Sequence, residues 1–185
     1  MFISIQDLEL RKVEFAETFA PGVIVFGPDS MQQEVLQVRG HAELIEEDHG
    51  GKKVIQDIRM LGDFSTRIEL SCSRCLEPVV ADLKGKFDLL YRPLGVDQRK
   101  SGEEIEITAD DVEIGYYRGN GLLLEDVLKE QVLLQLPLKP LCREDCKGLC
   151  PKCGANRNAA VCGCSTDITD ARWAALAGIK DKLKQ

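Results

Sequence analysis

The sequence has no uninterrupted apolar run long enough to cross a membrane, which would need about 20 consecutive apolar residues. Its first residues, MFISIQDLELRKVEF, are interrupted by Asp7, Glu9, Arg11 and Lys12, so they lack the apolar segment of a secretory signal peptide. These absences predict a cytoplasmic protein without a membrane partner. In the cytoplasm, clustered cysteines bind metal or take part in redox chemistry more often than they form structural disulfides.

The common signatures of catalysis are also missing. The sequence has no G-x-S-x-G motif and no Gly-rich phosphate loop, and one of its two histidines, His49, falls in a Gly-containing turn. The C-x-x-C motif of thiol–disulfide oxidoreductases belongs at the start of a helix, where the helix N-terminus lowers the pKa of the thiol. Neither C-x-x-C pair of this chain has that setting, so we expect no enzymatic activity.

One pattern imitates a catalytic site. His41 and Glu43, followed by Cys72 and Cys75, have the order of the zinc deaminase motif, H-x-E … P-C-x-x-C. Deaminases carry both parts of this motif at helix starts, whereas QVRGHAELIEE alternates like a strand. Ser71 also stands where the motif has proline. We therefore expect His41 to be an ordinary strand residue, and deamination remains only an alternative.

The net charge of −7 hides an asymmetry between two parts of the chain. From Leu136 onward, nine Lys and Arg stand against five Asp and Glu, a net charge of +4, which leaves −11 for residues 1–135. A body this acidic is a poor surface for nucleic acid and a suitable one for a basic protein partner.

Alternation of apolar and polar residues predicts an α+β fold, with an antiparallel sheet body of roughly four to six strands. Four segments alternate, and EIEI at 104–107 adds a candidate fifth; the four are 36–44, 54–60, 64–70 and 81–91. DHGG at 48–51 is a hairpin turn signal. From Leu124 the apolar residues recur at helical spacing, which predicts one long amphipathic helix that Pro137 ends.

The chain thus divides into a body of residues 1–137 and a cysteine-rich tail of residues 138–185. The tail holds six of the eight cysteines. It closes with STDITDARWAALAGIKDKLK, in which Trp173, Leu176 and Ile179 predict a short helix and Thr166 or Asp167 is a candidate N-cap. So short a tail cannot bury enough apolar surface to hold its fold, and bound metal would make up the deficit.

The eight cysteines occur in four pairs and predict zinc as the cofactor, because a structural zinc ion takes four thiolate or imidazole ligands in a closed tetrahedron. The nearest four form one candidate site within the tail: Cys150, Cys153, Cys162 and Cys164. The remaining four would then pin the tail onto the sheet: Cys72, Cys75, Cys142 and Cys146. Two alternatives remain open. The pairs 72/75 and 150/153 could together form a two-knuckle zinc ribbon, or only one ion could bind.

Five segments occur in a distinctive order between about residue 30 and 180: CSRCLEPV, FDLLYRP, LLLEDVLKEQVLLQLPLKPLC, CREDCKGLCPKCGANRN and DARWAALAGIK. In this order they resemble the YceD family, the large ribosomal RNA subunit accumulation proteins. The resemblance implies a bacterial cytoplasmic factor that is needed for normal accumulation of large-subunit ribosomal RNA. It implies a process rather than a reaction, and it carries over no catalytic residues.

The functional hypothesis is a non-enzymatic ribosome-biogenesis factor that supports accumulation of the large-subunit (23S) RNA by binding a basic ribosomal protein or an assembly intermediate. The alternative is an RNA-processing or RNA-modifying enzyme. Where the protein contacts ribosomal RNA directly, the candidate residues lie in or beside the cysteine pairs: Arg74, Lys152 and Arg157.

Overall fold

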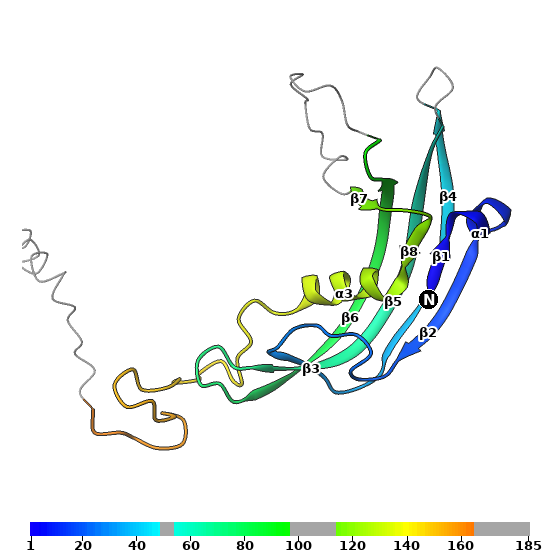
Figure 1. The fold of residues 1–185 in the computed structure, drawn as a ribbon. Helices are drawn as coiled ribbons and strands as arrows, with labels where there is room; N and C mark the ends of the chain where they lie inside the picture. The colour runs from blue at the N-terminus through cyan, green and yellow to red at the C-terminus, as the bar shows by residue number, and fades with distance from the viewer. Residues whose placement is uncertain (49–53, 97–113, 165–185) are drawn as a thin grey trace, which may run out of the picture.

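A curved β-sheet dominates the computed structural model, which describes residues 1–48, 54–96 and 114–164 (Figure 1). Helices are few, and the cysteine clusters lie toward the C-terminal part of the described chain. Three expectations lie outside the described residues: the turn after Asp48, the strand at 104–107 and the helix containing Trp173.

The main sheet has six strands in the order β2–β4–β5–β6–β7, with β3 beside β5. β3 and β4 lie along the same edge of β5. β4 pairs with residues 54–65 of β5, and β3 pairs with residues 68–70. A second, two-stranded sheet pairs β1 with β8. The strands are β1 Phe2–Ser4, β2 Val13–Phe19, β3 Ser30–Gln32, β4 Leu36–Asp48, β5 Val54–Ser71, β6 Pro78–Pro93, β7 Ile114–Tyr117 and β8 Gly121–Leu123.

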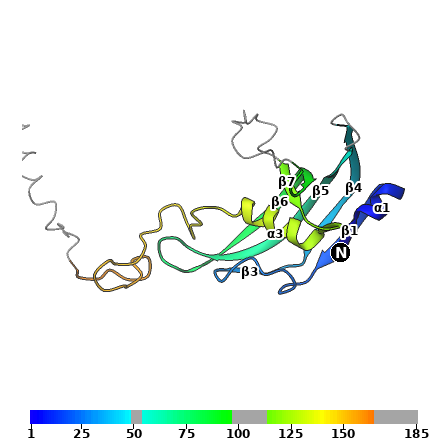
Figure 2. The same cartoon turned by 45° about the horizontal axis from the view of Figure 1, so that its top comes forward.

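The two faces of the main sheet differ because successive side chains of a strand point to opposite sides. One face, called the inner face here, is apolar and is covered by α3, Leu124–Gln135, whose buried side chains join the same core (Figures 1 and 2). Ile58, Met60 and Phe64 of β5 are buried there. The opposite, outer face carries cross-strand ion pairs such as Arg59 with Asp88.

The prediction of one long amphipathic helix is not confirmed. Within the described residues the structure has two helices, α1 at Ile5–Leu10 and the 12-residue α3. α3 is limited at both ends: the preceding residues pair with β1 as strand β8, and Leu136 takes an extended conformation before Pro137. The segment IQDLEL forms α1, and the side chain of its N-cap residue Ser4 accepts a hydrogen bond from the Asp7 N–H.

Two features of the sheet depart from the pattern read from the sequence. The segments 54–60 and 64–70 are parts of one continuous 18-residue strand, β5. β7 pairs parallel to β6, whereas the other strands of the sheet pair antiparallel. Parallel neighbours need a crossover of about a dozen residues or more, and residues 94–113 supply that length.

Glycines without side chains allow aromatic rings to lie directly on the inner face of the central strands. Gly40 of β4 pairs with Gly62 of β5, and they are flanked in register by Phe15 and Phe87. A Cβ atom at Gly62 would lie 2.6 Å from the Phe87 ring, and one at Gly40 would lie 2.1 Å from the carbonyl oxygen of Leu61. The Phe87 ring therefore packs directly against the backbone of Gly62, with no room for a side chain between them.

Replacing Gly40 by alanine is expected to lower the free energy of unfolding by about 1–3 kcal/mol, because the new methyl group meets backbone atoms that cannot rotate away. Urea denaturation followed by circular dichroism would measure the change. Gln37→Ala on the same strand is the control and should stay within about 0.5 kcal/mol of the parent protein, since Gln37 is exposed. Equal effects of both substitutions would contradict the steric argument.

Candidate metal centres

The turn that joins β5 to β6 contains the first cysteine knuckle. Cys72 directly follows β5, and the chain reverses over the next residues before β6 begins at Pro78. The N–H of Cys72 donates to the carbonyl oxygen of Glu77 at 2.8 Å, and the N–H of Leu76 donates to the carbonyl oxygen of Cys72 at 3.0 Å. These bonds hold Cys72 and Cys75 on the same side of the turn.

The second knuckle repeats this backbone arrangement. The N–H of Cys150 donates to the carbonyl oxygen of Ala155, and the N–H of Gly154 donates to that of Cys150, both at 2.8 Å. The residue after the second cysteine is left-handed in both knuckles: φ is 72° at Gly154 and 63° at Leu76. The same turn is therefore built twice, once in the sheet and once in the tail.

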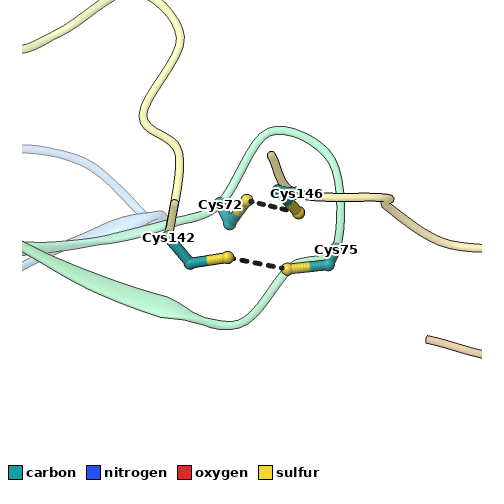
Figure 3. Close-up of side chains that lie close together, drawn as sticks. All are labelled: Cys72, Cys75, Cys142 and Cys146. Carbon is teal, nitrogen blue, oxygen red and sulfur yellow. Dashed lines mark hydrogen bonds between the residues drawn. The ribbon is translucent and has the colours of Figure 1, made fainter. Parts of the chain in front are cut away.

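The first cluster is made by two cysteines of the β5–β6 turn and two of the tail (Figure 3). The sulfur of Cys72 lies 3.8 Å from that of Cys146, and the sulfur of Cys75 lies 3.6 Å from that of Cys142. Four sulfurs held tetrahedrally at about 2.3 Å from one zinc ion lie about 3.8 Å apart. A disulfide needs about 2.05 Å. The spacing fits a shared metal ion and not a pair of disulfides.

The second cluster lies within the tail. The sulfurs of Cys150, Cys153, Cys162 and Cys164 all lie within 4.8 Å of one another, as do those of the first cluster. The structure thus places the knuckles at 72–75 and 150–153 in separate clusters, and the ribbon-like combination of these two pairs is not assembled. Cys142 and Cys146 each have cysteine neighbours, unlike the isolated thiols of the one-ion alternative.

The electrostatics of both clusters favour a bound cation. The backbone N–H of Arg74 donates to the Cys72 sulfur and lowers its pKa to about 6. Burial, together with the neighbouring thiol of Cys75, raises the pKa of Cys142 to about 12. The tail cluster has the same division, with the pKa of Cys150 lowered to about 6 by N–H groups of its own knuckle. Four thiols this close cannot all ionise unless a cation offsets their repulsion.

Residues outside the cysteines hold the first cluster in place. Asn158 donates from Nδ2 to the sulfur of Cys146 at 3.2 Å, and its Oδ1 accepts from the N–H of Lys147 at 2.8 Å. Hydrogen bonds of this kind orient metal ligands and stabilise their charge. The spacing of the cysteines alone does not point to Asn158. Its position in ANRN, directly after the second knuckle, was the available signal.

The three candidate RNA-contacting residues have different surroundings. Arg74 joins the two parts of the protein: its Nη1 donates to the carbonyl oxygen of Cys146 at 2.9 Å, and its own carbonyl oxygen accepts from the N–H of Leu149 at 2.9 Å. Lys152 and Arg157 have exposed side chains in the tail. Arg74 therefore has a structural task that the RNA hypothesis did not anticipate.

The structure does not assemble the deaminase-like pattern. His41 pairs with Leu61, which is separated from Cys72 by roughly 35 Å of strand at about 3.3 Å per residue. Glu43 forms an ion pair with Lys12 at 2.7 Å, and this partner lowers the pKa of the Glu43 carboxyl. Neither residue can act on a metal held by the cysteines.

No helix in the described part of the chain combines the length and the apolar character that crossing a membrane requires.

The family profile and a named relative that match this chain carry the same family description. The family profile described as large ribosomal RNA subunit accumulation protein YceD matches residues 60–180. Uncharacterized proteins of Mycobacterium bovis and Mycobacterium tuberculosis are 30% identical over 133 residues, covering 72% of this chain and 60% of theirs. An Arabidopsis thaliana protein, named large ribosomal RNA subunit accumulation protein YCED homolog 1, chloroplastic, is 25% identical over 147 residues, covering 69% of this chain and 46% of its own.

The matched region thus spans less than two thirds of the length of these relatives. No solved structure matches the chain.

Proposed function

Since this chain belongs to the YceD family of large ribosomal RNA subunit accumulation proteins, we propose that it is a non-enzymatic, cytoplasmic ribosome-biogenesis factor of bacteria. It supports accumulation of the large-subunit (23S) ribosomal RNA by binding a basic ribosomal protein or an assembly intermediate. The family name gives the process, and the partner and mode of action are the proposed part.

The observation that supports a non-enzymatic role is that each cysteine cluster offers four protein ligands, which would fill every position around a zinc ion. Each offers four sulfurs within 4.8 Å of one another, which is the ligand set of a structural zinc ion. Catalytic zinc sites keep one position open for water or substrate, and four thiolates leave none. We therefore assign one zinc ion to each cluster: the ion of the first cluster holds the tail on the sheet, and the ion of the second holds the fold of the tail itself.

Charge supports a protein partner over RNA. Residues 1–135 carry −11. A zinc ion with four thiolates has a net charge of −2, so two such sites, which draw six of their eight thiolates from residues 136–185, largely offset the +4 of that segment. Binding to phosphates scales with the number of available Lys and Arg side chains. An acidic surface instead attracts a basic protein by long-range electrostatics.

Cells that lack the protein are expected to contain less 23S RNA relative to 16S RNA, and an affinity-tagged copy should co-sediment with large-subunit particles or their precursors. Sucrose-gradient centrifugation with quantification of both RNAs would measure this. The 16S RNA serves as the internal control. The RNA-processing alternative would replace the proposal if the purified protein alone cleaved or modified 23S precursor RNA.

A further inference from the structure

Leu76 has an unfavourable backbone conformation, and its side chain is not buried in the protein. Its φ of 63° lies in the left-handed region, where a residue with a Cβ is destabilised by about 1–2 kcal/mol. The equivalent position of the other knuckle is Gly154, which has no such penalty. The Leu76 side chain is 65% exposed. A strained and exposed leucine at a turn indicates that its side chain serves binding to another molecule and not the packing of this chain.

Two further exposed apolar side chains lie on the outer face of the sheet near this turn. Met31 of β3 and Val80 of β6 both pair with Glu69 of β5, so the side chains of Met31, Glu69 and Val80 form one row across the strands. Met31 also lines a hollow together with Leu76. Met31 is 58% exposed and Val80 is 52% exposed. We call Met31, Leu76 and Val80 the Leu76 patch.

A shallow hollow of about 320 Å³ runs between Met31 and Leu76. Prolines 28 and 78 form part of its wall, so its rim is stiff as well as apolar. Among its lining residues the charged side chains are those of Asp29 and Glu69. The hollow therefore combines aliphatic walls with negative charge.

We propose that the Leu76 patch and its hollow bind a basic segment of a large-subunit ribosomal protein, with an aliphatic side chain of that segment inserted between Met31 and Leu76. Asp29 and Glu69 would pair with lysine or arginine residues that flank the inserted side chain. The proposal rests on the function proposed above and names the surface that carries it out.

The chemistry of the patch favours protein over RNA. Unpaired bases are held by stacking on aromatic side chains and by a positively charged groove along the backbone. The Leu76 patch is aliphatic, and its charged neighbours in the hollow are carboxylates that repel phosphate. Apolar anchors surrounded by charges of one sign are instead suited to a protein segment of opposite charge.

The test uses the full-length, zinc-loaded protein and each large-subunit ribosomal protein as a separately purified probe, with 23S RNA fragments as a further probe. Titrations at about 0.05 and 0.15 M salt would give Kd values for the parent protein and for Leu76→Gly, Met31→Gln and Val80→Thr. We expect at least one basic ribosomal protein to bind, and Leu76→Gly combined with Val80→Thr to weaken that binding at least tenfold. Asp29→Asn with Glu69→Gln should weaken binding mainly at the lower salt.

Leu76→Gly separates binding from folding, because it relieves the left-handed strain and should leave the urea midpoint unchanged or raised. Leu10→Ser, at an exposed leucine of α1, is the matched control and should bind like the parent protein. Unchanged affinity of the patch variants would overturn the proposed surface. Tight binding of 23S fragments that the patch variants lose would show that the surface recognises RNA.

The same variants distinguish this proposal from the one on which it rests. If the tagged parent protein fails to co-sediment with large-subunit particles, the proposed function is wrong. If the parent protein co-sediments and the Leu76→Gly, Val80→Thr variant does so equally, the proposed function stands and the Leu76 patch is not its binding surface.

Discussion

Removing metal from the purified protein with a strong chelator is expected to detach residues 142–164 from the sheet while the sheet itself stays folded. In the part of the tail that the structure describes, the buried apolar side chains are those of Cys146 and Cys150. Beyond the sulfurs, the tail is held by a few hydrogen bonds, such as that from the N–H of Ser73 to the carbonyl oxygen of Pro140. So few contacts cannot offset the entropy of ordering the tail.

The zinc ions proposed above would supply the missing free energy, on the order of 10 kcal/mol for a small zinc module. Elemental analysis should find two zinc ions per chain before treatment. Hydrogen–deuterium exchange should then become fast for residues 142–164 after chelation, while amides of β4, β5 and β6 stay protected, because their core lies on the inner face and contains no cysteine.

The double variant Cys150→Ser, Cys153→Ser offers an internal control. It should lose one ion and the protection of residues 150–164, whereas the first cluster, with Cys142 and Cys146, keeps its metal and its contact with the β5–β6 turn. A protein that contains no zinc and whose eight thiols all react freely would contradict the structural role assigned to both clusters. One ion per chain would restrict that role to a single cluster.

Replacing Asp57 by alanine is expected to lower the free energy of unfolding by about 3–5 kcal/mol. The Asp57 side chain has no exposed surface, and the side chain of its partner Arg92 is only 10% exposed. Arg92 donates from Nη2 at 2.7 Å and from Nε at 3.2 and 3.1 Å to the two carboxylate oxygens. Loss of the carboxylate would remove these hydrogen bonds and the adjacent negative charge from a largely buried guanidinium.

The exposed ion pair of Arg39 with Asp63, at 3.0 Å on the same face of the sheet, provides the matched control. Asp63→Ala should change the free energy of unfolding by less than about 1 kcal/mol, because water already screens that pair. Urea denaturation at neutral pH would compare the two variants. Similar values for both would mean that the remaining interactions of Arg92 compensate for the loss of Asp57.

The sequence predicted most of the sheet because the alternation of residues is a local property. Leu36, Val38 and Ala42 mark the inner face of β4 without reference to any other strand. The alternation on either side of LGD did not show that residues 54–60 and 64–70 form one strand, because a glycine such as Gly62 normally marks a turn or bulge in such a pattern. Its place in a continuous strand depends on Gly40 and on the Phe87 ring, which only the strand register brings together.

The cysteine positions were readable for a different reason: thiolate chemistry and C-x-x-C spacing act over a few residues. The sequence could not show the backbone conformation that each knuckle imposes on the residue after its second cysteine. Leu76 is left-handed only because the knuckle closes around it, although its position after Cys75 matches that of Gly154 after Cys153. The contact of Asp57 with Arg92 likewise depends on the pairing of β5 with β6.

The first cluster joins cysteines that lie 67 and 74 positions apart in the chain. At a synthesis rate of about 5–20 residues per second, the 67 residues that separate Cys75 from Cys142 take roughly 3 to 13 s to be added. During that interval β5 and β6 can pair as a hairpin, while the two thiols at its turn have no tail cysteines with which to share a metal. Capture of the ion proposed for the first cluster would therefore come late in the synthesis of each molecule, and oxidants that reach Cys72 and Cys75 earlier would compete with metal binding.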